Sequence, residues 1–474
     1  MKCTIYYLAI LIIFFFSSCE SSKKEKELIN GIWESIGYGK IISIENKEYA
    51  LYDRTKISCL PAQKGNISDF KNTITAQNDT LSISSGTSIY KYFRIDSLPN
   101  LCSKNFAENK RTDPIYNFEV FSKTIEENYA YFGLNKINWG GLYINSKNKI
   151  TSKTTEVELY LVLDEMLDKL NDNHGDIEPT DKIYEQAEKL NPEVKENVQM
   201  KEYGDFQIAQ MVAEHFLDED MTKDSWLIEW GKMKNNIGYM QVKAMWLFGD
   251  LNLSDSLIKQ NGFVDTYVEA FNKLNESNYV KAEVKGIRLI MDKVMKDLND
   301  TDFLILDVRF NGGGQDAVGL EILKCFNNRK VQVATKKAVY KNNYTERTPI
   351  FIEYSKHPYK KPIYLLTSQQ SASATDFMTL ASLELKNIKR IGSHTNGALS
   401  DALGKKLPNG WFFSISNQIY EDNQGKCYEN IGVPVNYELN YPSDRQTFFR
   451  SVANNLEKDK IDILNAIEEL RTKQ

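Results

Sequence analysis

The stretch PIYLLTSQQSASATDFMTLASLEL, from Pro362 to Leu385, decides how the chain around it folds. Its first part, Ile363 to Leu366, is an apolar run too short for a helix, and its second part carries apolar residues at helical spacing. This pattern predicts a strand, a serine-rich loop and a helix. Ser371 or Ser373 would then lie at a helix N-terminus, where unpaired N–H groups and the helix dipole stabilise a developing negative charge. A nucleophilic serine is one interpretation, and an N-cap or loop serine is the other.

A second strand, turn and helix are predicted between Phe303 and Leu323. The run FLILDV, residues 303 to 308, is typical of a strand that is covered on both faces. Gly312-Gly313-Gly314 follows it, and a turn without Cβ atoms can present backbone N–H groups to an oxyanion or a phosphate. Neither GxGxxG nor GxxxxGK is present, which disfavours phosphate. A tight turn with no further role is the alternative. The two strand-turn-helix segments together predict an α/β core.

The first nineteen residues predict an export signal. Lys2 precedes an apolar run, Ile5 to Phe16, that is too short to span a bilayer, and Ser17-Ser18-Cys19 follows it. This ending resembles a bacterial lipobox, in which the cysteine becomes the diacylated N-terminus; a cleavable signal with a chance cysteine is the alternative. We therefore expect a signal peptide over residues 1–18, a lipid on Cys19 and a polar tether over residues 19–29. The protein would be held by lipid in the cell envelope, at the outer membrane, on its periplasmic or surface side.

The amino-acid composition limits which molecules the protein is expected to bind. The net charge of −5, with both signs mixed, lacks the basic excess that nucleic-acid binding requires. Besides Cys3 and Cys19 the chain contains Cys59, Cys102, Cys325 and Cys427. Cys59 and Cys102 lie in the same small region, so an oxidising periplasm would allow a disulfide between them. No CxxC motif or His/Cys cluster indicates a metal site, and oligomeric state leaves no signal in the sequence.

The sequence pattern predicts three structural regions after the tether. Short β-rich runs broken by polar turn residues predict a small antiparallel β-domain over residues 30–105. A helical layer follows over residues 112–180, with one helix beginning at Asp113-Pro114 and another at the capping box of Thr155 and Glu158. Residues 181–474 form the α/β core, in which the polar segment 181–224 is predicted to be an elaboration or cap.

Only four histidines could activate a serine. They are His174, His215, His357 and His394. A serine nucleophile needs a base within hydrogen-bond reach in the folded chain. His215 falls in a helical stretch and His357 in a charged loop, so both are most simply surface residues. His174 and His394 lie in turns and are the candidates.

Two separated motifs carry a family resemblance. DVRFNGGG, residues 307–314, and SASATD, residues 371–376, together resemble the paired signature of the C-terminal processing (tail-specific) serine peptidases, DxRxNxGG followed by SAxxE. The resemblance implies that Ser373 is the nucleophile, three residues before the acidic position, where Asp376 replaces the usual Glu. Processing peptidases proper carry a lysine in a GxxTxGKG loop. Ala398 occupies that position here, so a Ser/Lys dyad is excluded.

Two more positions match the tricorn-core/retinoid-binding-protein-like branch of that family. Its LxDxH motif is matched by Leu170 to His174, and its late ExxGV segment by Glu429 to Val433. The resemblance implies a crotonase/ClpP-like ββα core in which His174 is the base of Ser373 and Glu429 supports His174. The N–H groups of Gly312, Gly313 and Ala374 would bind the oxyanion. It also implies a peptide or unfolded-protein substrate and no metal or organic cofactor. The family's PDZ domain is not evident here, and the β-domain lies outside the family's catalytic core.

Three functions are therefore compared. The first is an active serine endopeptidase of the cell envelope. The second is an inactive homologue that binds peptides or small hydrophobic ligands, which the departures at Ala398 and Asp376 keep open. The third is an acyl-CoA enzyme of the crotonase fold, which would need no serine nucleophile and would find no acyl-CoA outside the cell.

Overall fold

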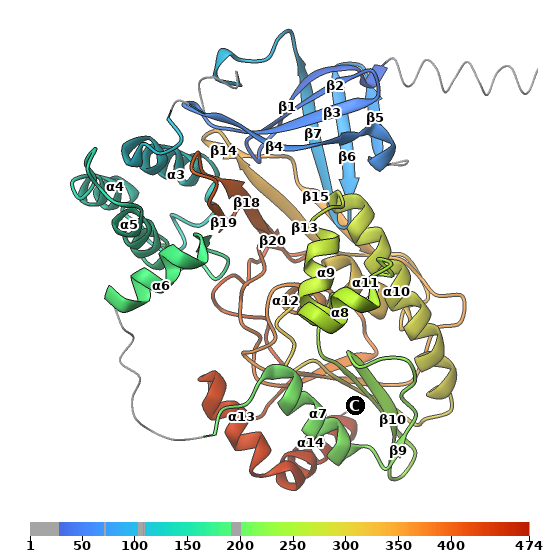
Figure 1. Cartoon of the computed structure of the whole chain (residues 1–474). Coiled ribbons are helices and arrows are strands. Elements are labelled where there is room, and N and C mark those ends of the chain that lie inside the picture. The colour runs from blue at the N-terminus through green and yellow to red at the C-terminus, as the bar shows by residue number, and fades with distance from the viewer. Residues whose placement is uncertain (1–27, 71–72, 103–107, 109, 191–200, 474) are drawn as a thin grey trace, which may run out of the picture. The chain divides into compact units, whose positions relative to one another are not determined.

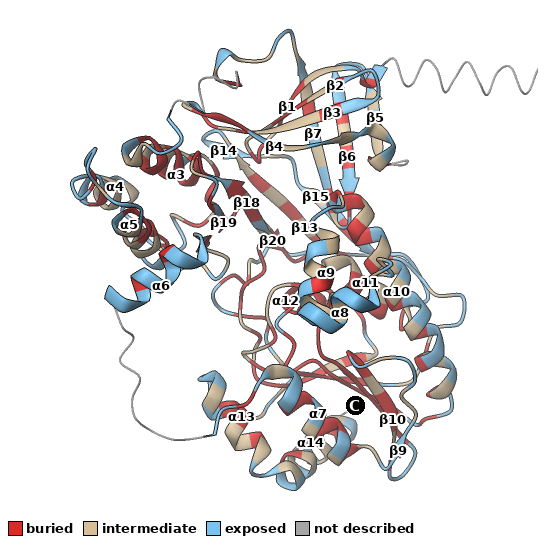
Figure 2. Cartoon of the chain, viewed as in Figure 1, coloured by how far each residue is buried: buried red, intermediate tan, exposed pale blue. Residues whose placement is uncertain are grey.

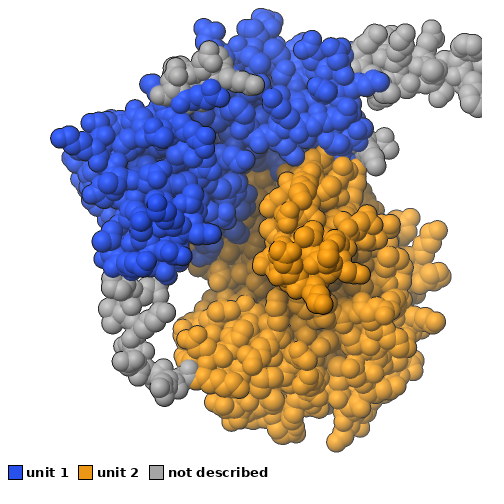
Figure 3. All heavy atoms as spheres, in the orientation of Figure 1, with its two compact units in different colours: residues 1–191, 338–345, 402–417 blue, residues 192–337, 346–401, 418–474 orange. Residues whose placement is uncertain are grey.

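The computed structural model describes residues 28–70, 73–102, 108, 110–190 and 201–473. The predicted signal peptide, Cys19 and nearly all of the tether lie outside the described residues. Among the residues that are described, no helix combines the length and hydrophobicity needed to cross a membrane. The chain divides into two compact units (Figure 3). Unit 1 comprises Met1–Asn191, Ala338–Thr345 and Ala402–Asn417, and unit 2 comprises Pro192–Lys337, Glu346–Asp401 and Gln418–Gln474.

Unit 1 contains a seven-stranded antiparallel sheet in the order β4-β3-β2-β1-β7-β6-β5 (Figure 1). One face buries Trp33, Ile42 and Leu81, and the other packs Ile41 beside the disulfide between Cys59 and Cys102. The predicted antiparallel β-structure and the predicted disulfide are therefore confirmed. The strands are β1 (Gly31–Ser35), β2 (Lys40–Glu45), β3 (Glu48–Arg54), β4 (Cys59–Asn66), β5 (Ile74–Gln77), β6 (Thr80–Ser85) and β7 (Ser88–Ile95), with short 3-10 turns at Ile67–Phe70 and Asn100–Cys102.

The predicted helical layer follows in unit 1. Asp113 caps the first helix by accepting hydrogen bonds from the N–H groups of Ile115 and Tyr116, and Thr155 with Glu158 forms the predicted capping box. Phe121 of the first helix packs on Phe413 of a three-stranded antiparallel sheet, β18-β19-β8, at 5.0 Å between ring centroids. The elements are α3 (Pro114–Asn128), α4 (Trp139–Lys147), α5 (Glu156–Asp168), β8 (Asp176–Glu178), α6 (Asp181–Leu190), β18 (Ala402–Lys406) and β19 (Phe412–Ser416).

Unit 2 is a three-layer α/β structure around a seven-stranded sheet in the order β21-β17-β16-β12-β11-β10-β9. The strands from β11 to β21 are parallel, and β10 and β9 continue the sheet antiparallel. The central strands β11, β12 and β16 are buried along their whole length. The helix α8 (Asp255–Asn261), in contrast, contains no buried residue and is largely exposed (Figure 2). The strands are β9 (Glu219–Asp220), β10 (Ile228–Met233), β11 (Ile237–Val242), β12 (Leu304–Asp307), β16 (Ile363–Thr367), β17 (Ile388–Gly392) and β21 (Tyr437–Glu438).

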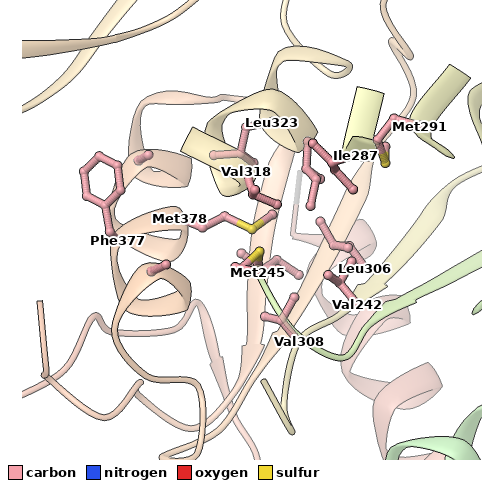
Figure 4. Close-up of a cluster of buried hydrophobic side chains, with 14 of the residues drawn as sticks. Val242, Met245, Ile287, Met291, Leu306, Val308, Val318, Leu323, Phe377 and Met378 are labelled. Carbon is pink, nitrogen blue, oxygen red and sulfur yellow. The ribbon is translucent and has the colours of Figure 1, made fainter. Parts of the chain in front are cut away.

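Alternate residues of the parallel strands face different helices. Leu306 packs with Ile287, Val318 and Met378 of α10 (Glu276–Asp297), α11 (Asp316–Lys324) and α12 (Ala374–Ala381), as Figure 4 shows. Ile305 faces the opposite side, where α7 (Asp205–Phe216), α13 (Arg445–Ala453) and α14 (Leu456–Thr472) cover the sheet. The predicted α/β core is confirmed, because a sheet buried on both faces explains why residues 303–306 are all apolar.

The polar segment 181–224 differs from the prediction. Its helix α7 is part of the layer that covers the parallel sheet, and it lies beside α13 and α14 in Figure 1. Ile208, Val212 and Phe216 are spaced four residues apart and form its buried stripe. The high average polarity of the segment hid this stripe, because the other faces of the helix are solvated.

The remaining elements complete unit 2 and the β13 hairpin. Asn275 caps α10, and its side chain accepts a hydrogen bond from the Asn278 N–H. The strand β13 pairs with β15 and β20, and its end pairs with β14. These elements are α8 (Asp255–Asn261), α9 (Phe263–Phe271), β13 (Val331–Tyr340), β14 (Asn343–Tyr344), β15 (Thr348–Ile352), the 3-10 turn Ser382–Glu384 and β20 (Gln418–Glu421).

Candidate active site

The predicted serine-rich loop joins β16 to α12, and Ser373 lies at the N-cap position of the helix. Its backbone has φ 56° and ψ −120°, a region that residues with a Cβ rarely adopt. Holding a residue other than glycine there costs of the order of 1–3 kcal/mol, and such residues cluster at active sites. The half-buried Ser373 therefore stands out from the other serines of the loop.

Ser371 has a different environment. It is completely buried, and its Oγ donates to the Val308 carbonyl at 2.9 Å and accepts from the Ser368 N–H at 3.0 Å. A hydroxyl engaged in both directions holds the loop together. The structure thus separates the two serines that the sequence pattern left open, and gives Ser371 a supporting role.

The glycine turn packs directly on this loop. Gly313 has φ 110°, and a Cβ there would lie 2.7 Å from Ser373 Cβ and 3.0 Å from the Ala374 nitrogen. Gly312 beside it is exposed. The Gly313 N–H donates to Asn311 Oδ1 at 2.9 Å, so this predicted oxyanion donor is engaged within its own turn. Of the three predicted donors, Gly313 and Ala374 lie side by side next to Ser373.

Asn311 is a residue whose role the sequence did not predict. Its Nδ2 donates to the Val242 carbonyl at 3.0 Å, and its own carbonyl accepts from the Ala372 N–H at 3.2 Å. It therefore joins the end of β11, the glycine turn and the serine loop. The only signal in the sequence is its fixed place in the DVRFNGGG motif.

Asp376 holds a second loop against Ser373. Its Oδ2 accepts from the N–H groups of Ser373 at 2.9 Å and Ala398 at 3.0 Å, and its Oδ1 accepts from the Gly397 N–H at 2.8 Å. The carboxylate is completely buried, and this burial raises its pKa to about 6 against the opposing effect of hydrogen bonds, including one from Thr395. The sequence had marked Asp376 only as a departure from Glu.

Glu429 binds the same loop at Leu399 and Ser400. It is buried, and its Oε2 accepts from the N–H groups of Leu399 at 2.9 Å and Ser400 at 3.1 Å. The Asn430 N–H donates to the Gly397 carbonyl at 2.7 Å. Residues 395–400, which we call the clamped loop, are therefore held between Asp376 and Glu429 within unit 2.

His174 belongs to unit 1 and lies in a turn that ends at β8. The Asp172 carboxylate accepts from the His174 N–H at 3.1 Å, from the Ser416 N–H at 2.8 Å and from Ser416 Oγ at 2.5 Å. Ser414 Oγ donates to the His174 carbonyl at 2.7 Å. Asp172, the acidic residue of the LxDxH motif, thus pins the turn of residues 172–175 to β19.

The other histidines have different surroundings. The ring of His394 spans the Thr395 carbonyl, 2.9 Å from Nδ1, and Gln369 Nε2, 3.2 Å from Nε2, so both of its nitrogens are engaged. His215 Nε2 lies 3.0 Å from a carboxylate oxygen of Glu457, and His357 is exposed. That His174 rather than His394 is the base stays a prediction.

A buried ion cluster lies beside the glycine turn and the serine loop. The Arg309 guanidinium is inaccessible to solvent and lies 2.7 Å from Asp307 and 2.8 Å from Asp459 of α14. Tyr441 contacts both Arg309 and Asp459. The Arg309 carbonyl accepts from Ser368 Oγ at 2.5 Å. The sequence could not have predicted that Asp459, 150 residues further on, would complete this cluster.

The described ranges contain no group of three or more His, Cys, Asp or Glu side chains placed to hold a metal ion.

Comparison with known proteins finds a family match over part of the chain. Residues 268–439 match the family model of peptidase family S41. No curated protein matches the sequence. A structure from Parabacteroides merdae, whose peptidase assignment is provisional, is 17% identical with a TM-score of 0.51 and covers 73% of this chain and 96% of its own, which indicates a shared fold. The photosystem II D1 C-terminal processing protease is 12% identical with a TM-score of 0.41 over 72% of this chain and 98% of its own. A lipoprotein from Streptococcus agalactiae is 15% identical with a TM-score of 0.42 over 77% and 100%.

Proposed function

Because the chain carries a serine peptidase domain of family S41, we propose that it is an endopeptidase that cleaves peptides or unfolded proteins in the cell envelope with Ser373 as its nucleophile. The observation that carries this assignment is the contrast within the serine loop. Ser373 is held in a strained conformation at the start of α12, whereas Ser371 is buried and hydrogen-bonded on both sides.

In the proposed reaction, Ser373 Oγ attacks the scissile carbonyl carbon while His174 accepts the hydroxyl proton. His174 then returns the proton to the leaving amine, and a water molecule hydrolyses the acyl-enzyme by the reverse sequence. Glu429 supports the histidine directly or through a polar neighbour, in addition to its two bonds to the clamped loop. His174 belongs to unit 1 and Ser373 to unit 2.

The oxyanion would be bound by backbone N–H groups beside Ser373. Ala374 at the helix start and Gly312 are the proposed donors, and Gly313 joins them when its N–H turns away from Asn311 Oδ1. One such donor is typically worth roughly 3 to 4 kcal/mol of transition-state stabilisation.

Labelling with a fluorophosphonate probe tests the assignment. Ser373→Ala should abolish both labelling and peptide hydrolysis, and His174→Ala should abolish or nearly abolish them, while the fold is retained. Ser371→Ala is the matched serine control and should retain most of the labelling. His394→Ala is the matched histidine control, and a loss there equal to that of His174→Ala would show that the wrong base was chosen.

A peptide binder without catalysis is the second candidate. The observation that favours it is the engaged Gly313 N–H, since loss of one oxyanion donor weakens stabilisation of the transition state while peptide can still bind. Wild-type protein that neither labels nor cleaves an unstructured-peptide library, yet binds its members, would select this function.

The envelope location rests on the lipobox-like ending at Cys19, with the short Leu28-Ile29-Asn30 segment leading into β1. Two or more acyl chains hold a protein stably on a membrane. We expect the mature protein to fractionate with membranes and Cys19→Ala to release or mislocalise it. An intact mass that shows an unmodified N-terminus elsewhere would rule out the anchor.

A further inference from the structure

A buried lysine joins the N-terminal sheet to the strands that carry His174. Lys405 lies in β18, and its side chain is 3% exposed. Its Nζ donates to the carbonyls of Tyr38 and Gly39, both at 2.7 Å, and to Asp53 Oδ1 at 2.9 Å. An ammonium has three donors, so all of them are used, and all three acceptors belong to the N-terminal sheet and its turn.

The acceptors form a cradle that suits an ammonium. Gly37, Tyr38 and Gly39 have φ angles of 83°, 64° and 53°, so three successive residues take a left-handed conformation. Tyr38 has a Cβ and holds this conformation at a cost in free energy. The strained turn places two carbonyls on the ammonium group of Lys405.

The electrostatics of the contact are costly. Burial lowers the pKa of Lys405 to about 8. Burial alone would raise the pKa of Asp53, but Lys40 and Lys405 outweigh it and lower that pKa. A buried ion pair of this kind contributes little net stability compared with apolar side chains, and its best attested use is to define one particular packing.

Lys405 is connected to His174 through the paired strands β18 and β19. Lys405 pairs in register with Phe413 of β19, the residue next to Ser414. Ser414 and Ser416 are the residues that bond the His174 carbonyl and the Asp172 carboxylate. Every contact in this path lies within unit 1.

We propose that Lys405 is a positioning residue for His174, and that the N-terminal sheet, through Asp53 and the turn at Tyr38, is a working part of the active site. The inference rests on the proposed role of His174 as base. The sheet spans residues 31–95 and lies outside the range 268–439 that matches the family model, so the family match does not predict this role.

The test compares Lys405→Met with Lys406→Met in the full chain. Both variants remove one ammonium from the same strand, but Lys406 is exposed. Lys405→Met should lower kcat for peptide hydrolysis by about 10- to 100-fold with KM unchanged, because a displaced base slows the chemical step without changing substrate binding. Hydrogen exchange measured by mass spectrometry should become faster in residues 172–177 as well as in residues 37–54. Lys406→Met should change neither.

The outcomes separate this inference from the proposed function. Unchanged kcat, with faster exchange confined to residues 37–54, would overturn the positioning role. If Lys405→Met does not fold, Asp53→Asn removes the charge of the partner at nearly the same volume and should give the same two changes at smaller amplitude. If the wild type neither labels nor cleaves, the proposed function fails, and hydrogen exchange in residues 172–177 alone decides whether Lys405 holds the histidine turn.

Discussion

Asp376 accepts a hydrogen bond at 2.9 Å from the backbone N–H of Ser373, three residues before it. The same carboxylate accepts from Gly397 and Ala398, so one buried group fixes both the backbone of the proposed nucleophile and the start of the clamped loop. Ala398, which stands where the GxxTxGKG pattern has lysine, donates its N–H to this carboxylate at 3.0 Å.

Asp376→Asn should therefore impair labelling more than its small change in volume suggests. The amide NH₂ of the new asparagine would replace one of the two carboxylate oxygens. It would then face backbone N–H groups, and at least one of these N–H donors would lose its acceptor. We expect the labelling rate to fall by about 10- to 100-fold and the free energy of unfolding by about 1–3 kcal/mol. Stopped labelling reactions and urea denaturation measure the two effects. Asp292→Asn on the exposed face of α10 is the control, and an Asp376→Asn variant that matches it would contradict the clamping role.

Titration of Asp376 should affect both the stability and the activity of the protein, and the two effects should have opposite signs. Its pKa is raised by burial from 3.8 to about 6, so the folded state binds this proton more tightly than the unfolded state. The stability of the wild type relative to Asp376→Asn should consequently fall as pH rises from 3.8 to about 6.

Activity should follow the other sign, because only the ionised carboxylate can accept from all its donors. Below pH 6 the labelling rate should fall with a steeper dependence than one imidazole base produces on its own, whose ordinary pKa is about 6.5. In Asp376→Asn the labelling rate should fall less steeply at low pH, as expected when only one group is protonated. Rate profiles between pH 4 and 8 measure this, and parallel acid limbs in the two proteins would refute it.

Asp459→Asn should destabilise unit 2 from the C-terminal helix. Arg309 is inaccessible to solvent between Asp307 and Asp459, and removal of one carboxylate leaves a buried cation only partly compensated. We expect a loss of roughly 3 kcal/mol in the free energy of unfolding. Asp462→Asn, which breaks the exposed pair with Lys458 on the same helix, should cost no more than about 0.5 kcal/mol. Equal urea midpoints for the two variants would show that the buried cluster does not stabilise the fold.

Reduction of the Cys59–Cys102 disulfide should destabilise unit 1. The bond joins residues 43 apart, and by loop-closure entropy its loss should cost about 4 kcal/mol. Urea denaturation with and without reductant measures this loss, and Cys59→Ser/Cys102→Ser should match the reduced wild type. Burial raises the thiol pKa of Cys325 to about 12, so this cysteine should not exchange with the disulfide. Peptide mapping that finds Cys59 and Cys102 free in the oxidised protein would remove the premise.

Local features were predictable because their causes are local. The strand and helix of Pro362 to Leu385, the Asp113 cap and the Thr155 capping box all depend on residues within a few positions of one another. The disulfide was predictable because two cysteines share one small domain. The α7 stripe was missed because its buried residues are a minority in a polar segment.

The sequence by itself determined the order of strand, turn and helix, the chemistry available at each turn and, through its spaced motifs, the resemblance to a family of serine peptidases. Only the tertiary structure shows how the environments of Ser371 and Ser373 differ, because Ser371 Oγ donates to the carbonyl of Val308, 63 residues away. It also decided which groups Asp376, Asp172 and Lys405 bind, since their partners lie on loops and strands that are distant in the chain. Hydrogen bonds of buried carboxylates and ammonium groups depend on which backbone N–H and carbonyl groups converge on them, and only the folded chain brings those groups together.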